Sequence, residues 1–278
     1  MRTIDILIPS PAEASYHGEA LEQARAYVDA FAHAGLDLRP LPWTDPQAGS
    51  APALALLAWG YHLNLPAWTT LLDGWTTDVP LFNSPALMRW NTRKTYLAEL
   101  ESAGVPTVPT LFGNAGPEAI AAAFDRLGAD ELIVKPQVSA GSHQTYRLKR
   151  GDHFPALPEA MVQPFLPAIQ DEGEYSLFYI GGALTHAIVK RATDGDFRIQ
   201  PQFGGVNESW EPEAEALAVA ETALANAPIA ATYARIDLLR RLDGKLALIE
   251  FEAIEPDLYS HHGEGVLKQL AAAVATSL

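Results

Sequence analysis

Residues 233–252 read YARIDLLRRLDGKLALIEFE and contain the strongest local structural signal in the chain. Asp243-Gly244 lies between two runs rich in apolar residues, an arrangement typical of a tight β-hairpin. A two-residue loop would pair Leu242 with Lys245. The stretch therefore predicts two antiparallel strands whose register follows from the turn.

The predicted register brings charged side chains together on one face of this hairpin. Counting from the turn places Asp237 opposite Glu250 and Arg235 opposite Glu252. Because side chains alternate along a strand, all four project to the same side. The other side is covered by four apolar residues, Ile236, Leu238, Ile249 and Phe251. Directly opposed like charges destabilise a sheet by about 0.2–1 kcal/mol, so we expect a cation to offset the repulsion.

A divalent metal ion is the simplest cation for this acidic face. Mg²⁺ is typically held by one or two carboxylates together with substrate phosphates. We therefore interpret Asp237, Glu250 and Glu252 as metal ligands for Mg²⁺ or Mn²⁺, with Arg235 as a donor to the same phosphates. The alternative is a solvated acidic edge, in which Arg235 and Glu252 form an ordinary cross-strand pair.

The composition argues against several classes of site and partner. The 278-residue chain has a net charge of -15, which argues against a broad surface for nucleic acid or anionic membrane. It contains no cysteine, which excludes disulfides, thiolate nucleophiles and zinc–thiolate sites. The apolar stretch at residues 4–8 is too short for a signal peptide or a membrane span. We expect a cytoplasmic protein of two or three packed subdomains.

The first eighty-odd residues alternate short apolar runs with helical patterns. Strands are predicted at residues 4–8, 36–41, 53–59 and 79–82, and helices at 19–34 and 66–75. This alternation predicts a small open α/β unit with a parallel sheet. Pro9-Ser10-Pro11 follows the first strand where a dinucleotide-binding protein would carry its glycine-rich turn, which argues against a Rossmann-type oxidoreductase.

The remainder of the chain predicts mixed helices and strands in two further parts. Ser84 is a helix N-cap followed by a helical tract to residue 103, and the prolines of the segment 104–110 break that tract. The later elements are strands at 132–135, 160–163, 175–180 and 184–190 and helices at 117–127 and 211–225. Gly181-Gly182 predicts a hairpin turn. We expect three subdomains, 1–86, 87–165 and 166–278.

Five segments upstream of the acidic hairpin resemble the ATP-grasp superfamily in their order and spacing. They are NTRK at 91–94 with GVPTVP at 104–109, LIVKP at 132–136, SAGS at 139–142, MVQPFL at 161–166 and GEYS at 173–176. The resemblance covers residues 84–259. It implies an α/β fold with an N-terminal Rossmann-like subdomain, a small central lid and a C-terminal antiparallel sheet that carries the metal site.

The resemblance also implies roles for individual residues in binding ATP. Lys94 and Lys135 would contact the α- and β-phosphates, and a loop with Ser139, Gly141 and Ser142 would close over them. The adenine and the rest of the nucleotide would meet Gln163, Phe165, Leu166 and Glu174. Arg191 and Arg235 are candidates for stabilising the γ-phosphoryl group or an acyl phosphate. The alternatives are a surface lysine at 94, a plain turn at 139–142 and a surface strand end at Arg191.

The implied activity is the Mg-ATP-dependent joining of a small acid to a nitrogen nucleophile. The carboxylate would become an acyl phosphate with release of ADP, and an amine or hydroxylamine-type nitrogen would then displace phosphate. The segments 84–91 and 170–178 are similar to the small ligases that close the D-cycloserine ring, whereas Ser176 stands where glutathione synthetases have an arginine.

Several alternatives and contacts stay open. A nucleotide-binding protein without turnover and a kinase-like phosphotransferase are the two alternative functions. Glu255, Asp257, Tyr259 and Ser260 follow the metal strand and could face the nucleophile, and His261-His262 could contact substrate or lie exposed. A homo-oligomer, dimer or tetramer, is expected from the resemblance.

Overall fold

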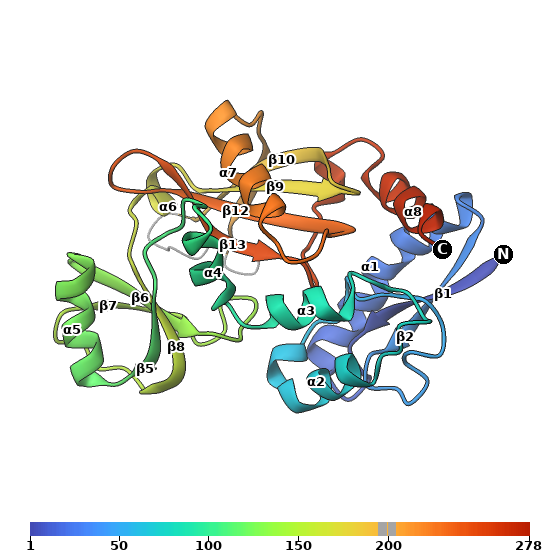
Figure 1. Cartoon of the computed structure of the whole chain (residues 1–278), viewed down its shortest axis with the longest axis horizontal. Coiled ribbons are helices and arrows are strands. Elements are labelled where there is room, and N and C mark those ends of the chain that lie inside the picture. Colours follow the sequence, from blue (N-terminus) through green and yellow to red (C-terminus); the bar gives the residue numbers. More distant parts are fainter. Residues whose placement is uncertain (194–198, 200–203) are drawn as a thin grey trace.

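Three β-sheets organise the chain in the computed structural model, which describes residues 1–193, 199 and 204–278 (Figure 1). The first sheet contains β1 (Arg2–Ile8), β2 (Leu36–Pro42), β3 (Ala53–Leu54) and β4 (Leu81–Phe82) in the order β2-β1-β3-β4. All its strand pairs are parallel, which confirms the predicted α/β unit. The accompanying helices are α1 (Ala14–His33), the 3₁₀ turn η1 (Tyr61–Leu63) and α2 (Leu65–Gly74).

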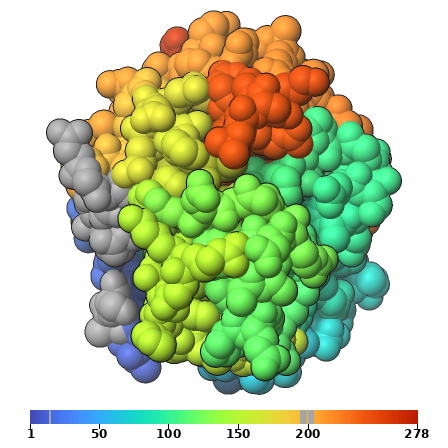
Figure 2. All heavy atoms as spheres, turned by 90° about the vertical axis from the view of Figure 1, so that its left-hand side faces the viewer, coloured from blue at the N-terminus to red at the C-terminus, as the bar shows by residue number. Residues whose placement is uncertain are grey.

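The second sheet is antiparallel and is covered on one face by a helix. It contains β5 (Leu111–Ala115), β6 (Glu131–Pro136), β7 (Tyr146–Lys149) and β8 (Leu157–Pro164) in the order β5-β8-β6-β7, with α5 (Pro117–Leu127). Figure 2 shows this unit at the front of one end of the molecule, below the orange-red tip of the later hairpin. Its core joins α5 to the sheet through Ile120, Phe124, Leu132 and Val134. Strands β5 and β7 were not predicted from the sequence.

The third sheet is also antiparallel and carries the predicted acidic hairpin. It contains β9 (Glu174–Ile180), β10 (Ala183–Arg191), β11 (Val206–Ser209), β12 (Tyr233–Arg240) and β13 (Leu246–Glu252) in the order β11-β10-β9-β12-β13. The nearby helices are α6 (Ala168–Asp171), α7 (Ala214–Ala225), η3 (Ser260–His262) and α8 (Val266–Thr276). Gly181 and Gly182 both have positive φ, at 58° and 79°, as a tight β9–β10 turn requires.

Two helices connect the first sheet to the second. The tract predicted as one helix is divided into α3 (Pro85–Thr92) and α4 (Tyr96–Ser102), because the backbone at Arg93 is extended. The predicted N-cap at Ser84 is confirmed, since its hydroxyl accepts a hydrogen bond from the Leu87 N–H. Side chains of both helices pack into the core of the third sheet.

The first and third sheets share a hydrophobic core, whereas the second sheet has its own. Ile4 and Ile6 of β1 belong to the same buried cluster as Phe178 of β9 and Leu270 of α8. Helix α8 consequently returns beside α1, and the two chain ends lie close together (Figure 1). The three sheets fall within the ranges 1–86, 87–165 and 166–278, while the subdomain boundaries themselves stay a prediction. Among the described residues, no helix is long and apolar enough to span a bilayer.

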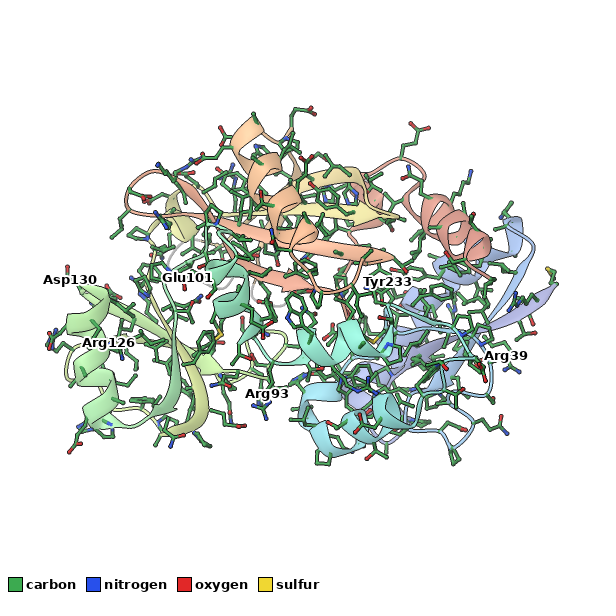
Figure 3. All side chains as sticks on the ribbon, viewed as in Figure 1. Arg39, Arg93, Glu101, Arg126, Asp130 and Tyr233 are labelled. Atoms are coloured by element: carbon green, nitrogen blue, oxygen red, sulfur yellow. The ribbon has the colours of Figure 1, made fainter. Side chains whose placement is uncertain are left out.

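The junction of the first and third sheets depends on a buried amide. Asn83 follows β4 and is 1% exposed. Its side-chain N–H groups donate to the carbonyls of Tyr233 and Ala253 at 2.8 and 2.9 Å, and its oxygen accepts from the Thr232 N–H at 2.5 Å. The hydroxyl of Tyr233, a residue labelled right of the centre in Figure 3, donates to the Ile254 carbonyl at 2.8 Å. These contacts connect the end of β4 to the start of β12 and to the segment directly after β13.

We predict that Asn83→Ala lowers the free energy of unfolding by about 1–3 kcal/mol, because buried backbone groups of the third sheet lose their partners. Urea denaturation followed by circular dichroism measures the change. Asn226→Ala is the matched control, since the Asn226 side chain is exposed and, among the described residues, donates only to the Thr222 carbonyl of α7. Equal stabilities of the two variants would contradict the structural role of Asn83.

Candidate active site

A cavity of about 770 Å³ lies where the three sheets meet. Nearly all the residues predicted for a nucleotide and metal site line it: Lys94, Lys135, Ser139, Gly141, Ser142, Gln163, Phe165, Leu166, Glu174, Arg235, Asp237, Glu250 and Glu252. Arg191 is the exception among the predicted site residues. Segments more than 150 residues apart in the sequence thus contribute to one site.

At the charged end of the acidic hairpin the strands pair in the predicted register. Two irregularities that the sequence did not show produce this register together. Asp237 pairs with Glu250 and Arg235 with Glu252, as expected. At the other end Arg240 pairs with Leu246, because the loop contains a third residue and Gly244 adopts a φ of 81°. An irregularity after Asp237 makes Ile249 an extra residue in β13, so the two one-residue shifts cancel.

The same bulge changes the face of the sheet on which the Ile249 side chain lies. Simple alternation places Ile249 on the apolar face with Phe251, and that prediction is wrong. Two residues on the bulged strand oppose one on its partner, so alternation is interrupted at Ile249. Ile249 therefore lines the cavity next to Glu250 and packs against the cluster that contains Leu166 and Leu239.

Two lysines from different parts of the chain neutralise Glu250. The Lys94 ammonium lies 2.9 Å from one carboxylate oxygen, and the Lys135 ammonium lies 3.9 Å from the other. Lys94 also donates to the Ser139 carbonyl at 2.6 Å. Burial raises the pKa of Glu250, but the charges of Lys94 and Lys135 outweigh that effect and hold the pKa below its ordinary value. The pairing gathers two cations beside the Ser139 loop.

A second ion network surrounds Asp237, which is only 2% exposed. The guanidinium of Arg235 contacts Asp237 at 2.9 Å and Glu252 at 2.5 Å. The ammonium of Lys190 lies 2.6 Å from Glu174 and 3.4 Å from Asp237. Burial raises the pKa of Asp237, but Arg235 and Lys190 outweigh it and hold that pKa at about 2. The carboxylate is therefore charged and fully engaged.

The comparisons with known proteins agree with this geometry. No family model matches the sequence. The cycloserine biosynthesis protein DcsG of Streptomyces lavendulae is 31% identical over 216 residues, which are 69% of this chain and 71% of DcsG. The crystal structure of D-cycloserine synthetase DcsG matches with a TM-score of 0.84 over 99% of both chains, at 21% identity. This chain belongs to the ATP-grasp ligases.

More distant ATP-grasp ligases share the fold. PsnB, in a complex with a precursor variant, Mg and ADP, matches with a TM-score of 0.67 at 16% identity, over 99% of this chain and 98% of PsnB. D-alanine–D-alanine ligase from Bacillus anthracis, in a complex with ATP, matches with a TM-score of 0.70 at 14% identity, over 100% and 99% of the two chains. The predicted ATP-grasp fold and the ADP-forming ligase class are confirmed, and relatives of this ligase bind ATP or ADP and Mg.

One end of the cavity in this ligase is apolar. It is lined by Val108, Leu166, Ile169, Leu239 and Ile249. Gln163 borders this end, and its amide donates to the Thr110 hydroxyl at 2.9 Å. The Arg147 guanidinium lies 3.5 Å from the centre of the Phe165 ring. The segment before Thr110 is held there because the Val108 N–H donates to the Leu248 carbonyl of β13.

The loop at residues 139–142 lines the cavity, and its Ser139 carbonyl accepts a hydrogen bond from Lys94. Gly141 and Ser142 have φ values of 57° and 60°, a backbone region that glycine adopts readily and serine rarely. A side chain added at Gly141 would meet no atom within 4 Å, so the glycine is needed for its backbone conformation and not for lack of space. The predicted turn is therefore present next to Lys94.

The three carboxylates predicted as metal ligands differ in how accessible they are to a divalent ion. Glu250 and Glu252 are two residues apart on β13, and their side chains are 22% and 26% exposed, whereas that of Asp237 is 3% exposed. Burial raises the pKa of Glu252 to about 7, with Glu250 and Asp237 adding to the effect and Arg235 opposing it. A cation would relieve that crowding. Within the described part of the chain, no three acidic or histidine side chains are already arranged around a common metal position.

The structure places Lys190 in the cavity and Arg191 outside its described lining. Neighbours on a strand point to opposite faces, so only one of the two can line the cavity. Arg191 contacts the Glu172 carbonyl and Glu208, and its side chain is 43% exposed. A count from the Gly181-Gly182 turn would pair Glu174 with Val189, but an irregularity between Leu184 and His186 shifts Lys190 opposite Glu174. The sequence contains no signal for that bulge.

The sequence did not predict most of the residues at the end of the cavity that is formed by the first sheet. Its lining includes Tyr16 and Glu19 of α1 and the segment from Trp59 to His62. Trp59 is partly buried, packs against the core shared by the first and third sheets, and lines the cavity. These residues follow no periodic pattern, because they lie in a helix end and an irregular turn. They reach the site only because α1 packs against the third sheet in the shared hydrophobic core.

The segment after β13 completes the same end of the cavity. Glu255, Asp257 and Tyr259 line it, as considered from the sequence, whereas Ser260, His261 and His262 are not among its described lining residues. The His262 ring instead contacts the Ser209 hydroxyl at 3.0 Å. Burial raises the pKa of Glu255 to about 8, and the charge of Glu252 adds to the shift. This end of the site is acidic and aromatic.

We predict that Glu255→Gln stabilises the protein increasingly as pH rises from about 5 to 8. The carboxyl pKa is about 8 in the folded protein and near 4.5 when unfolded, so the folded state binds more protons in this window and its stability falls with rising pH. The difference in free energy of unfolding between Glu255→Gln and the wild type grows by up to about 1.4 kcal/mol per pH unit. Urea unfolding across this range measures it, with exposed Glu101→Gln as the control. A difference in free energy of unfolding that does not change with pH would contradict the raised pKa of Glu255.

Proposed function

We propose that this ATP-grasp ligase phosphorylates the carboxylate of a small amino acid with Mg-ATP and closes a ring by attack of the substrate's own nitrogen, as a DcsG-like enzyme of cycloserine biosynthesis. The observation that carries the proposal is the cavity in which Lys94, Lys135 and the carboxylates of β13 meet an acidic and aromatic end. Similarity to DcsG over 69% of the chain supports the choice of reaction.

The nucleotide would lie along the second and third sheets. Lys94 and Lys135 would bind phosphate oxygens in place of Glu250, and the loop with Ser139, Gly141 and Ser142 would cover them. The apolar end next to Gln163, Phe165 and Leu166 fits the adenine, because a purine is flat and apolar on its faces. Glu174 would face the ribose side of the nucleotide from the start of β9.

Glu250 and Glu252 would hold the metal ion, Mg²⁺ or Mn²⁺. The ion would neutralise charge on the β- and γ-phosphates when it is bound. Asp237 would join these ligands only by exchanging a contact with Arg235, since Ser176, Lys190 and Arg235 occupy its oxygens. As the nucleotide takes Lys94 and Lys135 away from Glu250, the carboxylate becomes free for a cation.

The reaction would proceed in two displacements. A carboxylate oxygen of the substrate attacks the γ-phosphorus, the bond to the β-phosphate oxygen breaks, and ADP leaves. A nitrogen lone pair then attacks the acyl carbon, and the C–O bond breaks with departure of inorganic phosphate. Arg235 and Lys190 would stabilise negative charge at the transferred phosphoryl group, and positioning would supply most of the rate. Lys190 replaces Arg191 in this role because it lines the cavity.

The opposite end of the cavity fits a substrate with an ammonium group. Glu19, Glu255 and Asp257 line this end, and no hydrogen bond or ion pair to Glu255 is present among the described residues. Opening the amide bond of D-cycloserine gives O-amino-D-serine, which carries a carboxylate, an aminooxy nitrogen and an ammonium group. That molecule presents an acid and a nucleophile together. We further propose that the enzyme acts in the cytoplasm, where ATP is available, and as a homo-oligomer.

We predict that Glu250→Gln weakens Mg²⁺-dependent ATP binding at least tenfold, because the amide keeps the shape of the side chain but removes its charge. Isothermal titration calorimetry with and without Mg²⁺ measures the effect. The matched control is Glu101→Gln on α4, labelled in Figure 3, which removes the same charge at an exposed site. Unchanged binding by Glu250→Gln would count against the metal assignment, and no ATP binding by the wild type would count against the function.

We also predict that O-amino-D-serine, Mg²⁺ and ATP together yield ADP, phosphate and D-cycloserine in equal amounts. A coupled ADP assay and chromatographic detection of the ring measure the products. A kinase-like phosphotransferase would instead release a stable phosphorylated acid without the ring. D-Serine, which lacks the aminooxy nitrogen, is the control substrate and is expected to form no ring.

A further inference from the structure

The imidazole of His62 is a buried polar group at the cavity that has no hydrogen-bond partner among the described residues. His62 lies in η1 and lines the cavity on the side of the first sheet. Both ring nitrogens are buried, and neither has a hydrogen-bond partner within the described part of the chain. Buried polar atoms are nearly always paired in native proteins. The exception at the wall of a binding cavity points to a partner supplied by the ligand.

The surrounding structure determines where this ring lies. Gly60 precedes η1 with a φ of 81°, and the next residue, Tyr61, is buried with its ring centre 5.1 Å from that of Trp68. Tyr61 therefore anchors the turn in the core of the first sheet. The His62 ring then lies 5.6 Å from the ring of His143, which follows the loop at residues 139–142. The imidazole thus stands between the first sheet and the loop next to Lys94.

The charge state of His62 follows from this position. Burial lowers the pKa of His62 to about 4, and nearby His143 and Lys94 add to the effect. The ring is therefore neutral at pH 7, with one N–H donor and one nitrogen that can accept a proton. Glu250, the carboxylate that contacts Lys94, is already paired with two lysines. The neutral imidazole accordingly keeps one ring nitrogen free to accept a proton close to Lys94.

We propose that His62 is a catalytic residue of the second displacement, in which its free ring nitrogen accepts the proton that the attacking nitrogen loses. This inference rests on the proposed function. As the C–N bond forms and the C–O bond to phosphate breaks, the nitrogen becomes acidic and transfers one proton to His62. The imidazolium passes that proton to the departing phosphate, which leaves as hydrogen phosphate, so His62 returns to its neutral form and atoms and charge balance.

The two displacements can be separated experimentally with the full-length protein. Cyclisation of O-amino-D-serine reports both steps. O-Methyl-D-serine retains the carboxylate but lacks the attacking nitrogen, so ADP release and hydroxamate formation in the presence of hydroxylamine report the first step alone. His62→Ala and His62→Gln remove the proton acceptor. His262→Ala is the matched control, because His262 is outside the described lining of the cavity.

We expect His62→Ala and His62→Gln to reduce kcat for cyclisation by about 10²-fold or more, the usual contribution of a general base. Hydroxamate formation and the KM for ATP should stay within about twofold of the wild type. Added imidazole should restore part of the cyclisation by His62→Ala and none by His62→Gln, whose side chain fills the space. A merely structural role would lower both activities together and would not respond to imidazole.

Two results would overturn the role of His62 alone, and two others would also reject the proposed function on which it rests. Cyclisation at the wild-type rate by both variants would remove His62 from the chemistry. Equal losses of cyclisation and hydroxamate formation would place its role in binding or in phosphoryl transfer. A wild-type protein that forms hydroxamate but no ring would reject the ring-closing function and, with it, this role of His62. A wild type that forms neither product would reject the ligase function as a whole.

Discussion

The ion pair between Glu250 and Lys94 is the interaction on which the arrangement of the site depends. Glu250 belongs to the third sheet, Lys94 lies between α3 and α4, and the same ammonium donates to the Ser139 carbonyl in the connection between β6 and β7 of the second sheet. A buried carboxylate is unfavourable unless it is paired, so the third sheet requires these cations. The requirement brings the two proposed phosphate-binding lysines and the proposed metal ligand to one place.

The distribution of cores explains how one face of the third sheet can serve two purposes. Phe178 and Tyr233 pack against the first sheet and α8, whereas Ser176 and Asp237, further along the same face, line or support the cavity. The opposite face is covered by α3, α4 and α7. The second sheet keeps a separate core, so it contributes lysine and loop residues to the cavity without sharing the packing of the other two.

The cavity consequently has two chemically different ends. The end between the second and third sheets is apolar with lysines at its edge, which suits a base attached to phosphates. The end at the first sheet is aromatic and acidic and includes the neutral imidazole of His62. The proposed reaction first transfers a phosphoryl group to an acid and then joins the acid to a nitrogen nucleophile. It therefore needs both environments next to each other. The carboxylates of β13 lie at their boundary.

The sequence by itself determined the elements that depend on local patterns. Alternation of apolar residues predicted the parallel first unit, Ser84 predicted the start of α3, and Asp243-Gly244 predicted the acidic hairpin. The order of short segments predicted the ATP-grasp fold, and nearly all the site residues predicted from those segments line the cavity. These features could be read because hairpin turns, helix caps and strand periodicity involve residues close together in the chain.

Only the tertiary structure decided which side chains finally face the cavity. Bulges after Leu184 and at Ile249 exchange Lys190 for Arg191 and bring Ile249 to the cavity, and a bulge leaves no mark in an apolar run. The charge states of Glu252, Glu255 and His62 depend on burial among groups distant in the chain. The aromatic and acidic end depends on packing between the first sheet and the third. The physical reason is the same in each case: such effects arise from contacts between distant segments, which local sequence patterns do not encode.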